Sequence, residues 1–211
     1  PAPIPIMISS LIKFFFIYFS ISLKSLIKTT WVFENFDIKF AKSINQDDLK
    51  RHLIIYSSDE FEGRDTGSEG QRKAVEYLRE QYKAIGVEAG DPDKDYFQPM
   101  TLNFSPRRGE PAKDVKTENV ISIIKGREIP DEYIVITSHL DHVGVDNGQI
   151  YNGADDDGSG TVTMLEIAEA LKIGLENGYK PKRSILFLHV TGEEEGLLGS
   201  AYYAENPLYP L

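Results

Sequence analysis

Two short apolar runs on either side of a predicted helix are the feature that most constrains the fold of this chain. Residues 133–137 (Tyr-Ile-Val-Ile-Thr) and 185–190 (Ile-Leu-Phe-Leu-His-Val) carry apolar side chains on both faces of a strand, which is typical of strands buried within a covered sheet. Between them, residues 164–171 repeat apolar side chains at helical spacing, and Gly174 ends the pattern. A strand, a helix and a second strand in this order predict an α/β sandwich in which the two strands are parallel.

The residues before this unit predict two more helices and a covering segment. One helix begins near Asn45, where two aspartates follow in the first turn. A second begins at Ser68, which forms a capping box with Gln71, and ends at Gly86. Residues 87–116 contain four prolines and many charges, and therefore predict a loop or an edge strand that covers the domain.

The first 33 residues differ in composition from the rest of the chain. They carry three lysines and no acidic residue, and residues 14–23 form an apolar run about half as long as a bilayer span requires. This run lies behind Lys13 and resembles the core of a secretory signal, with Met7 as a start, although no small-x-small cleavage pattern follows. We expect residues 1–33 to be a signal-like or disordered leader with no stable membrane span. Residues 45–211 would then form an exported domain, periplasmic or secreted, which an uncleaved leader would tether.

Charge and cysteine content exclude several classes of function. The net charge is −10, and the residues after position 33 carry 20 basic and 33 acidic side chains. This acidic balance argues against a nucleic-acid partner. The sequence has no cysteine, which excludes disulfides and thiolate zinc sites and leaves His, Asp and Glu as the strong metal ligands.

The stretch from Gly153 to Gly160 (Gly-Ala-Asp-Asp-Asp-Gly-Ser-Gly) places three consecutive carboxylates between glycines. Like charges this close repel each other, and a bound cation would remove the repulsion. The glycines would let the backbone aim several oxygen atoms at one ion. The alternative is a solvated acidic turn in which Asp157 or Ser159 caps the following helix.

Three clusters of potential metal ligands occupy comparable places in the predicted architecture. His139 and Asp141 follow the first apolar strand. Residues 155–157 begin the next helix, and residues 193–195 follow the second strand. Ligands of open α/β sheets gather at the carboxyl ends of the strands, so these clusters are expected to converge. Imidazole and carboxylate ligands without sulfur favour zinc, with manganese or cobalt as alternatives.

Spacing within the clusters indicates separate roles. His139 and Asp141 are two residues apart, so an extended backbone places them on the same side and the carboxylate can orient the imidazole. Glu193 and Glu194 are adjacent and face different ways, so one can bind a metal while the other accepts a proton from the attacking water. Each cluster alone also fits a satisfied polar strand end or a solvated helix start, but their joint placement favours metal-dependent hydrolysis.

Three ordered motifs carry a resemblance to a known family. They are Ser138–Asp141 (Ser-His-Leu-Asp), Gly153–Gly160, and Gly192–Ser200 (Gly-Glu-Glu-Glu-Gly-Leu-Leu-Gly-Ser). In order and separation they resemble the zinc-dependent exopeptidases of the bacterial leucyl aminopeptidase family, peptidase family M28, whose relatives include glutamate carboxypeptidases and glutaminyl cyclases. The loop at residues 59–67 resembles the usual lead-in of that family. The resemblance covers residues 45–211 and implies a three-layer α/β/α sandwich around a mostly parallel mixed sheet, of which this chain is the N-terminal portion.

The resemblance implies a site that holds two zinc ions. His139 matches a ligand of one zinc, and Glu194 matches a ligand of the other. Asp155 matches the carboxylate that bridges both ions, and the Asp155–Asp156 peptide matches one that is cis in the family. The implied reaction is hydrolysis of a peptide bond at a chain terminus. We expect an aminopeptidase, because this activity is the most frequent in the family.

The remaining polar residues receive other roles from the same resemblance. Glu193 matches the general base, and Asp141 matches the partner of the zinc-binding histidine. His52, His142 and His189 match no ligand, and His189 is expected in the core because it lies within an apolar strand.

The family pattern requires two further ligands downstream, an aspartate and a later histidine. Neither occurs before Leu211, so each zinc would keep two of its three protein ligands. We therefore expect weak metal binding and little activity from this chain alone.

Two readings of another class compete with the exopeptidase. Asp155, Asp157, Ser159, Gly160 and Glu166 match the spacing of a calcium-binding helix–loop–helix motif, which would make the chain a calcium module. That motif needs a helix on both sides, whereas the preceding residues read as turns. A catalytically inactive interaction domain of the same fold is disfavoured, because three ligand positions and the base are all occupied.

Overall fold

The computed structural model describes residues 38–105 and 111–210, and the predicted leader lies outside these residues. The chain divides into two units, Pro1–Ile38 and Lys39–Leu211, of which the second carries the sheet and the predicted site. Within the described ranges, no helix has both the length and the apolar character that crossing a bilayer requires.

A five-stranded mixed sheet forms the centre of the second unit, with the strand order β1–β3–β7–β4 and with β2 also paired to β3. Its strands are β1 (Glu88–Ala89), β2 (Phe97–Phe104), β3 (Lys113–Ile124), β4 (Ile129–His139) and β7 (Arg183–Val190). β4 and β7 are parallel, with His139 opposite Val190, and the helix between them supplies the crossover that parallel neighbours require. Both predicted apolar strands are therefore present and adjacent.

The predicted α/β fold with a mixed sheet is confirmed, but the described part of the sheet is not mostly parallel. β1, β2 and β7 all pair antiparallel with β3, so β4–β7 is the one parallel pairing among these strands. Residues 105–112 are too few for a crossover of a dozen residues or more, so β2 and β3 form a hairpin. β2 is the edge strand expected within residues 87–116, and its Pro99 is tolerated there because an edge strand can lack one donor.

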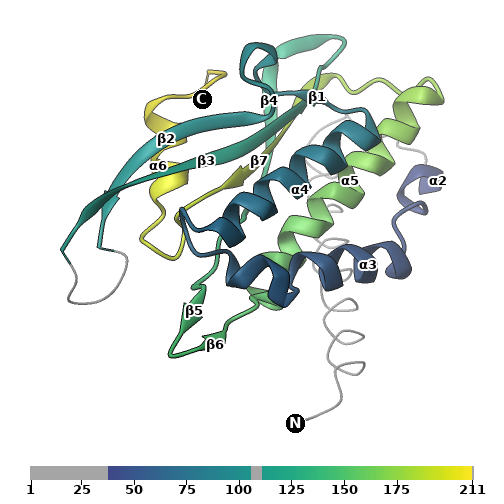
Figure 1. The fold of residues 1–211 in the computed structure, drawn as a ribbon. Coiled ribbons are helices and arrows are strands. Elements are labelled where there is room, and N and C mark those ends of the chain that lie inside the picture. The colour runs from purple at the N-terminus through teal and green to yellow at the C-terminus, as the bar shows by residue number, and fades with distance from the viewer. Residues whose placement is uncertain (1–37, 106–110, 211) are drawn as a thin grey trace. The chain divides into compact units, whose positions relative to one another are not determined.

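Helices cover both faces of the sheet (Figure 1). α4 (Glu69–Ile85) and α5 (Ser159–Glu176) lie side by side over one face, and α6 (Leu198–Glu205) lies on the other. α3 (Gln46–Tyr56) packs against α5. The shorter elements are α2 (Ile38–Ala41), η1 (Asp59–Arg64), η2 (Pro92–Lys94), η3 (Ala154–Gly158) and the hairpin of β5 (Val145–Asp146) and β6 (Gln149–Ile150).

The side chains of β7 alternate between two apolar layers. Leu186 and Leu188 face α6, where they pack with the buried Tyr203. Phe187 and His189 face α4, where both rings lie about 6 Å from the ring of Tyr82 (6.0 and 5.7 Å). Because each face of the strand is covered by a helix, every residue of β7 after Arg183 is buried, which confirms the three-layer arrangement.

The predicted helix boundaries follow from local hydrogen bonds. The side chain of Asn45 accepts the backbone N–H groups of Asp47 and Asp48 at the start of α3, each at 3.0 Å. Ser68 Oγ accepts the N–H of Gln71 at 3.1 Å at the start of α4. Gly86 ends α4 with φ +80°, a left-handed conformation that favours glycine.

One expectation is wrong, and one alternative is excluded. Residues 133–137 were predicted to be buried on both faces, but Val135 is 42% exposed because β4 is an outer strand of the described sheet. The calcium-binding motif is also excluded, because the β5–β6 hairpin stands where its first helix would have to be, with φ +49° at Asn147 and +78° at Gly148 in the turn. Glu166, the last ligand of that motif, instead faces the start of α3 near Asn45.

Glu166 is a buried carboxyl group in the helical layer. Its residue is 2% exposed, and its Oε1 atom has no hydrogen-bond partner among the described residues. Burial raises the pKa of Glu166 to about 7, although the backbone N–H of Asn45 acts in the opposite direction. The folded state therefore favours the neutral form of this side chain.

Replacing Glu166 with Gln should stabilise the chain above pH 7, on the order of 1 kcal/mol, because the neutral amide removes the cost of a buried negative charge. The pKa of Glu166 in the folded state lies above its ordinary value of 4.5, so the folded state binds more protons than the unfolded state between about pH 4.5 and 7. The free energy of unfolding of the wild type should therefore fall as the pH rises through this window. Urea unfolding at pH 5 and pH 8 measures both effects. Glu169→Gln, on the exposed side of α5, is the matched control; an equal response of both variants would contradict the prediction.

Candidate metal centre

His139, Asp156 and Glu194 form the group in the described residues that could hold a metal ion. Each offers one ligand atom, and these atoms all lie within 4.8 Å of one another. His139 ends β4, Asp156 lies in the η3 turn before α5, and Glu194 follows β7. The carboxyl ends of the two parallel strands thus bring the predicted clusters together.

Asp156 takes the position that was predicted for Asp155. Asp156 Oδ1 lies 3.0 Å from His139 Nε2, and the carboxylate of Asp155 is not part of the group. The cis peptide is Asp156–Asp157 and not Asp155–Asp156. Both predictions are therefore one residue too early.

The neighbouring Asp157 explains this register. Its Oδ1 accepts the N–H of Gly160 at 3.1 Å, and its Oδ2 accepts the N–H of His139 at 3.2 Å. A Cβ atom at Gly160 would lie 2.2 Å from Asp157 Oδ1, so the helix start is built around this carboxylate. Asp157 thus holds an N–H group in the first turn of α5, whose N-cap position is Gly158, and the residue before Asp157 is the one that reaches the imidazole. The three-residue offset from Asp157 to Gly160 is the sequence signal that could have set the register.

Asp141 organises the loop after β7. Its carboxylate is fully buried and accepts the backbone N–H groups of Glu193 and Glu194, at 3.2 and 3.4 Å, and the hydroxyl of Thr66 at 3.2 Å. Burial raises the pKa of Asp141, while the two N–H groups stabilise its ionised form. The predicted contact with His139 is made mainly by the backbone, since Nδ1 lies 3.2 Å from the Asp141 carbonyl oxygen and 3.9 Å from Oδ1.

A proton on Nδ1 of His139, donated to the Asp141 carbonyl, leaves the Nε2 lone pair facing the carboxylates. Glu193 lies beside this group, with its Oε2 atom 4.0 Å from Nε2 and its side chain 34% exposed. Glu193 and Glu194 therefore diverge, as their adjacency predicted. One joins the candidate ligands, and the other remains next to them.

Arg64 connects the segments that surround the site, a role that no sequence pattern indicated. The residue is 1% exposed, and its guanidinium donates to four backbone carbonyl groups. Nε donates to Leu140 O at 3.1 Å and Nη2 to Gly153 O at 2.8 Å. Nη1 donates to Tyr56 O at 2.9 Å and to Asn152 O at 2.8 Å. The end of α3, the segment after β4 and the segment before η3 are thus joined by one side chain.

A chain of four hydrogen bonds supports the backbone of His139 from the interior. Thr161 donates its hydroxyl to His139 O at 2.9 Å, so its oxygen accepts from Ser138 at 3.1 Å. Ser138 must then accept from His189 Nδ1 at 3.0 Å, and His189 Nε2 accepts from Tyr82 at 2.7 Å. Burial lowers the pKa of His189 to about 3, so the ring is neutral with its proton on Nδ1. The prediction that His189 is a core residue is confirmed, since it is fully buried.

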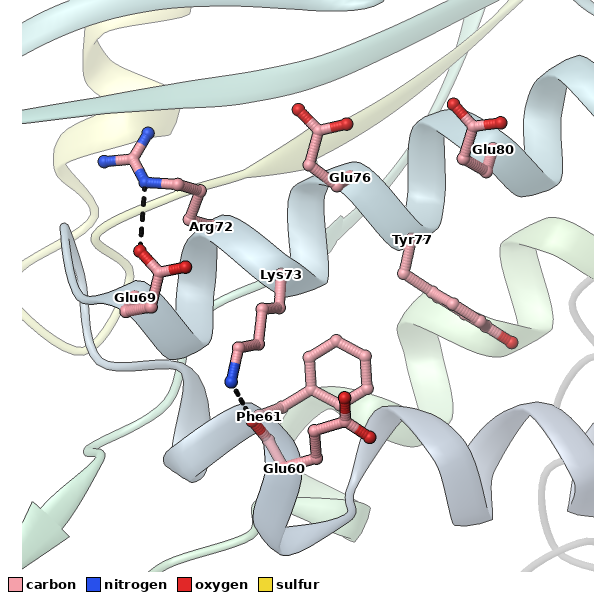
Figure 2. A pocket seen from close by; sticks show the side chains of 8 residues that line it. All are labelled: Glu60, Phe61, Glu69, Arg72, Lys73, Glu76, Tyr77 and Glu80. Carbon is pink, nitrogen blue, oxygen red and sulfur yellow. Dashed lines mark hydrogen bonds and ion pairs between the residues drawn. The ribbon is translucent and has the colours of Figure 1, made fainter.

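A separate surface depression lies along α4 and η1 (Figure 2). Its charged residues are partly engaged with neighbours, since Arg72 contacts Glu69 at 3.4 Å and Lys73 donates to the carbonyl of Glu60 at 3.1 Å. None of the candidate ligands lines it. The metal group and this depression are therefore different features of the surface.

Comparison with known proteins confirms the resemblance. Residues 119–210 match the profile of Peptidase family M28. A probable glutamate carboxypeptidase of Zea mays, VP8, is 39% identical over 113 residues, which are 54% of this chain and 15% of the maize protein. The chain thus spans a small part of this relative.

Two solved structures show the same fold. The LapA aminopeptidase of Legionella pneumophila superimposes with a TM-score of 0.57 and 20% identity, over 86% of this chain and 46% of LapA. The glutaminyl cyclase of Porphyromonas gingivalis gives a TM-score of 0.57 and 21% identity, over 78% of this chain and 54% of the cyclase. The chain covers about half of each structure, and at this identity the likeness establishes the α/β fold alone.

Replacing Arg64 with Lys should lower the free energy of unfolding by about 2–4 kcal/mol, because an ammonium group cannot donate to four carbonyl oxygens spread around a planar fork. Urea unfolding measures the change. Arg72→Lys on the exposed side of α4 is the control and should change stability by less than about 0.5 kcal/mol. A loss for Arg64→Lys no larger than that of the control would show that the four contacts do not hold these segments.

Proposed function

We propose that the protein carrying this chain is a metal-dependent exopeptidase that hydrolyses the terminal peptide bond of a peptide, with aminopeptidase activity as the first candidate. The observation that carries the proposal is the convergence of His139, Asp156 and Glu194, with the carboxylate of Glu193 beside them. The match of residues 119–210 to peptidase family M28 supports the same reaction class.

The donor set fits zinc. It combines one imidazole nitrogen with carboxylate oxygens, and its Nδ1–H contact fixes the histidine in the tautomer that a ligand needs. His139, Asp156 and Glu194 would hold the metal, since Asp156 Oδ1 lies 3.0 Å from the imidazole and the three ligand atoms form one group. The complete site would take two zinc ions. When bound, zinc supplies Lewis-acid polarisation of the peptide carbonyl and lowers the pKa of a water molecule.

The chain's own residues then perform three tasks. Glu193 accepts the proton of the attacking water at a carboxylate oxygen and returns a proton to the departing amine. Asp141 holds the backbone of Glu193 and Glu194, so the base and the ligand keep their separation. The acidic balance of the residues around the site suits recognition of a free α-amino group of the substrate.

A panel of three substrates separates the activities seen among the relatives. An aminopeptidase should release the amine from an aminoacyl anilide, a carboxypeptidase should release glutamate from an N-acylated dipeptide, and a cyclase should convert an N-terminal glutamine. Assayed with zinc on the full-length gene product, we expect the anilide to be cleaved fastest. No turnover of any of the three would overturn the proposed function.

Replacing Glu193 with Gln should lower kcat by about 10²–10⁴-fold, because the amide cannot accept the proton of the attacking water. Zinc content should stay unchanged, since Glu193 is not among the candidate ligands. The exposed Glu205→Gln variant on α6 is the control for a lost surface charge. Equal kcat values for both variants would show that Glu193 is not the base.

We also propose that the protein is exported, on the basis of the apolar, acid-free residues 1–33. A reporter enzyme that is active only outside the cytoplasm, fused after residue 33, should become active. Retention of an inactive reporter in the cytoplasm would contradict export.

A further inference from the structure

His142 contacts a candidate metal ligand, although no sequence pattern assigned it a role. Its Nδ1 atom lies 2.7 Å from Glu194 Oε1, and the two side chains are 14% and 22% exposed. An ionised carboxylate can only accept a hydrogen bond, so the proton of this contact is on Nδ1. A bond between a partly buried imidazole and a carboxylate belongs to the stronger class of hydrogen bonds.

The position of the His142 ring is set independently of Glu194. Its backbone N–H donates to the carbonyl of Arg64 at 3.2 Å. On the other side, Gly153 has φ +52°, and a Cβ atom there would lie 2.5 Å from Cγ and 2.6 Å from Cδ2 of the ring. The ring thus rests against a glycine whose own carbonyl is held by Arg64 at 2.8 Å. His142 is therefore a fixed donor, and the glutamate side chain is the partner that is oriented.

We propose that His142 is a positioning residue that holds one oxygen of Glu194 and leaves the other for the metal. Glu194 is then fixed at two points, its backbone N–H by the Asp141 carboxylate at 3.4 Å and its side chain by His142 at 2.7 Å. A long flexible carboxylate held in this way loses less conformational entropy when a metal binds. This inference rests on the proposed metal-dependent function, because it assigns Glu194 to the metal.

The test measures the zinc affinity of the full-length gene product by competition with a chromogenic chelator. His142→Ala should weaken zinc binding by about 10–100-fold, the usual effect of removing a hydrogen-bond partner of a metal ligand. His142→Asn places an amide N–H near the position of Nδ1 and should restore most of the affinity. His52→Asn is the matched control, because it removes a histidine of α3 that bonds to Tyr77 and lies outside the metal group.

The outcomes separate this inference from the proposed function. If the wild type binds zinc and the affinity of His142→Ala equals that of the wild type within about twofold, the positioning role alone is overturned. Failure of the wild type to bind zinc would overturn the metal centre and the inference with it. Urea unfolding of each variant confirms that the compared chains are folded.

A second readout needs no metal. Long-range ¹H–¹⁵N NMR of the metal-free wild type should show the proton of His142 on Nδ1, and Glu194→Gln should shift this signal. A neutral ring with its proton on Nε2, or no response to Glu194→Gln, would also overturn the proposal.

Discussion

The arrangement of the site depends on the hydrogen bonds that the guanidinium group of Arg64 donates to backbone carbonyls. Irregular segments can be buried only when their carbonyl groups find donors, and Arg64 supplies four such bonds within one plane. Asp141 does the converse with its carboxylate, which gathers the N–H groups of the loop after β7. Arg64 and Asp141 are linked through Leu140, whose carbonyl accepts a hydrogen bond from Arg64 and which precedes Asp141 in the chain. Arg64, which binds backbone carbonyls, and Asp141, which binds backbone N–H groups, together hold the segments that carry the candidate ligands.

This framing explains how the chain can place several carboxylates close together. Asp156, Glu193 and Glu194 surround one imidazole, and their mutual repulsion opposes folding when no cation is present. The backbone around them is held by Arg64 and Asp141, not by the carboxylates themselves. The relatives include named aminopeptidases, carboxypeptidases and cyclases. A shared fold therefore leaves the reaction to be decided by the site, in particular by what surrounds it.

The sequence predicted those features whose cause is local. β7, α4 and α5 follow from the spacing of apolar side chains, and the caps at Asn45 and Ser68 follow from residues within one turn. The convergence of the three ligand clusters followed from a general rule about strand ends.

The direction of β3 was not predictable in this way, because it depends on pairing with strands distant in sequence. Asp156 was missed because three identical side chains differ only in backbone direction. Arg64 and His142 were missed because their partners come from segments 76 and 52 residues away.

The hydrogen-bond network from Tyr82 to the backbone carbonyl of His139 differs in charge from the surroundings of the His139 ring. Each donor in the chain has one proton and one acceptor, so none of its groups can turn without a bond being lost. The neutral imidazole of His189 adds polarity without charge, because its pKa is lowered to about 3. The side chains of this hydrogen-bond network therefore carry no charge at neutral pH. The interior side of His139 is therefore held by neutral groups, and the carboxylates that face its imidazole, Asp156 and Glu193, lie on the side that is open to solvent.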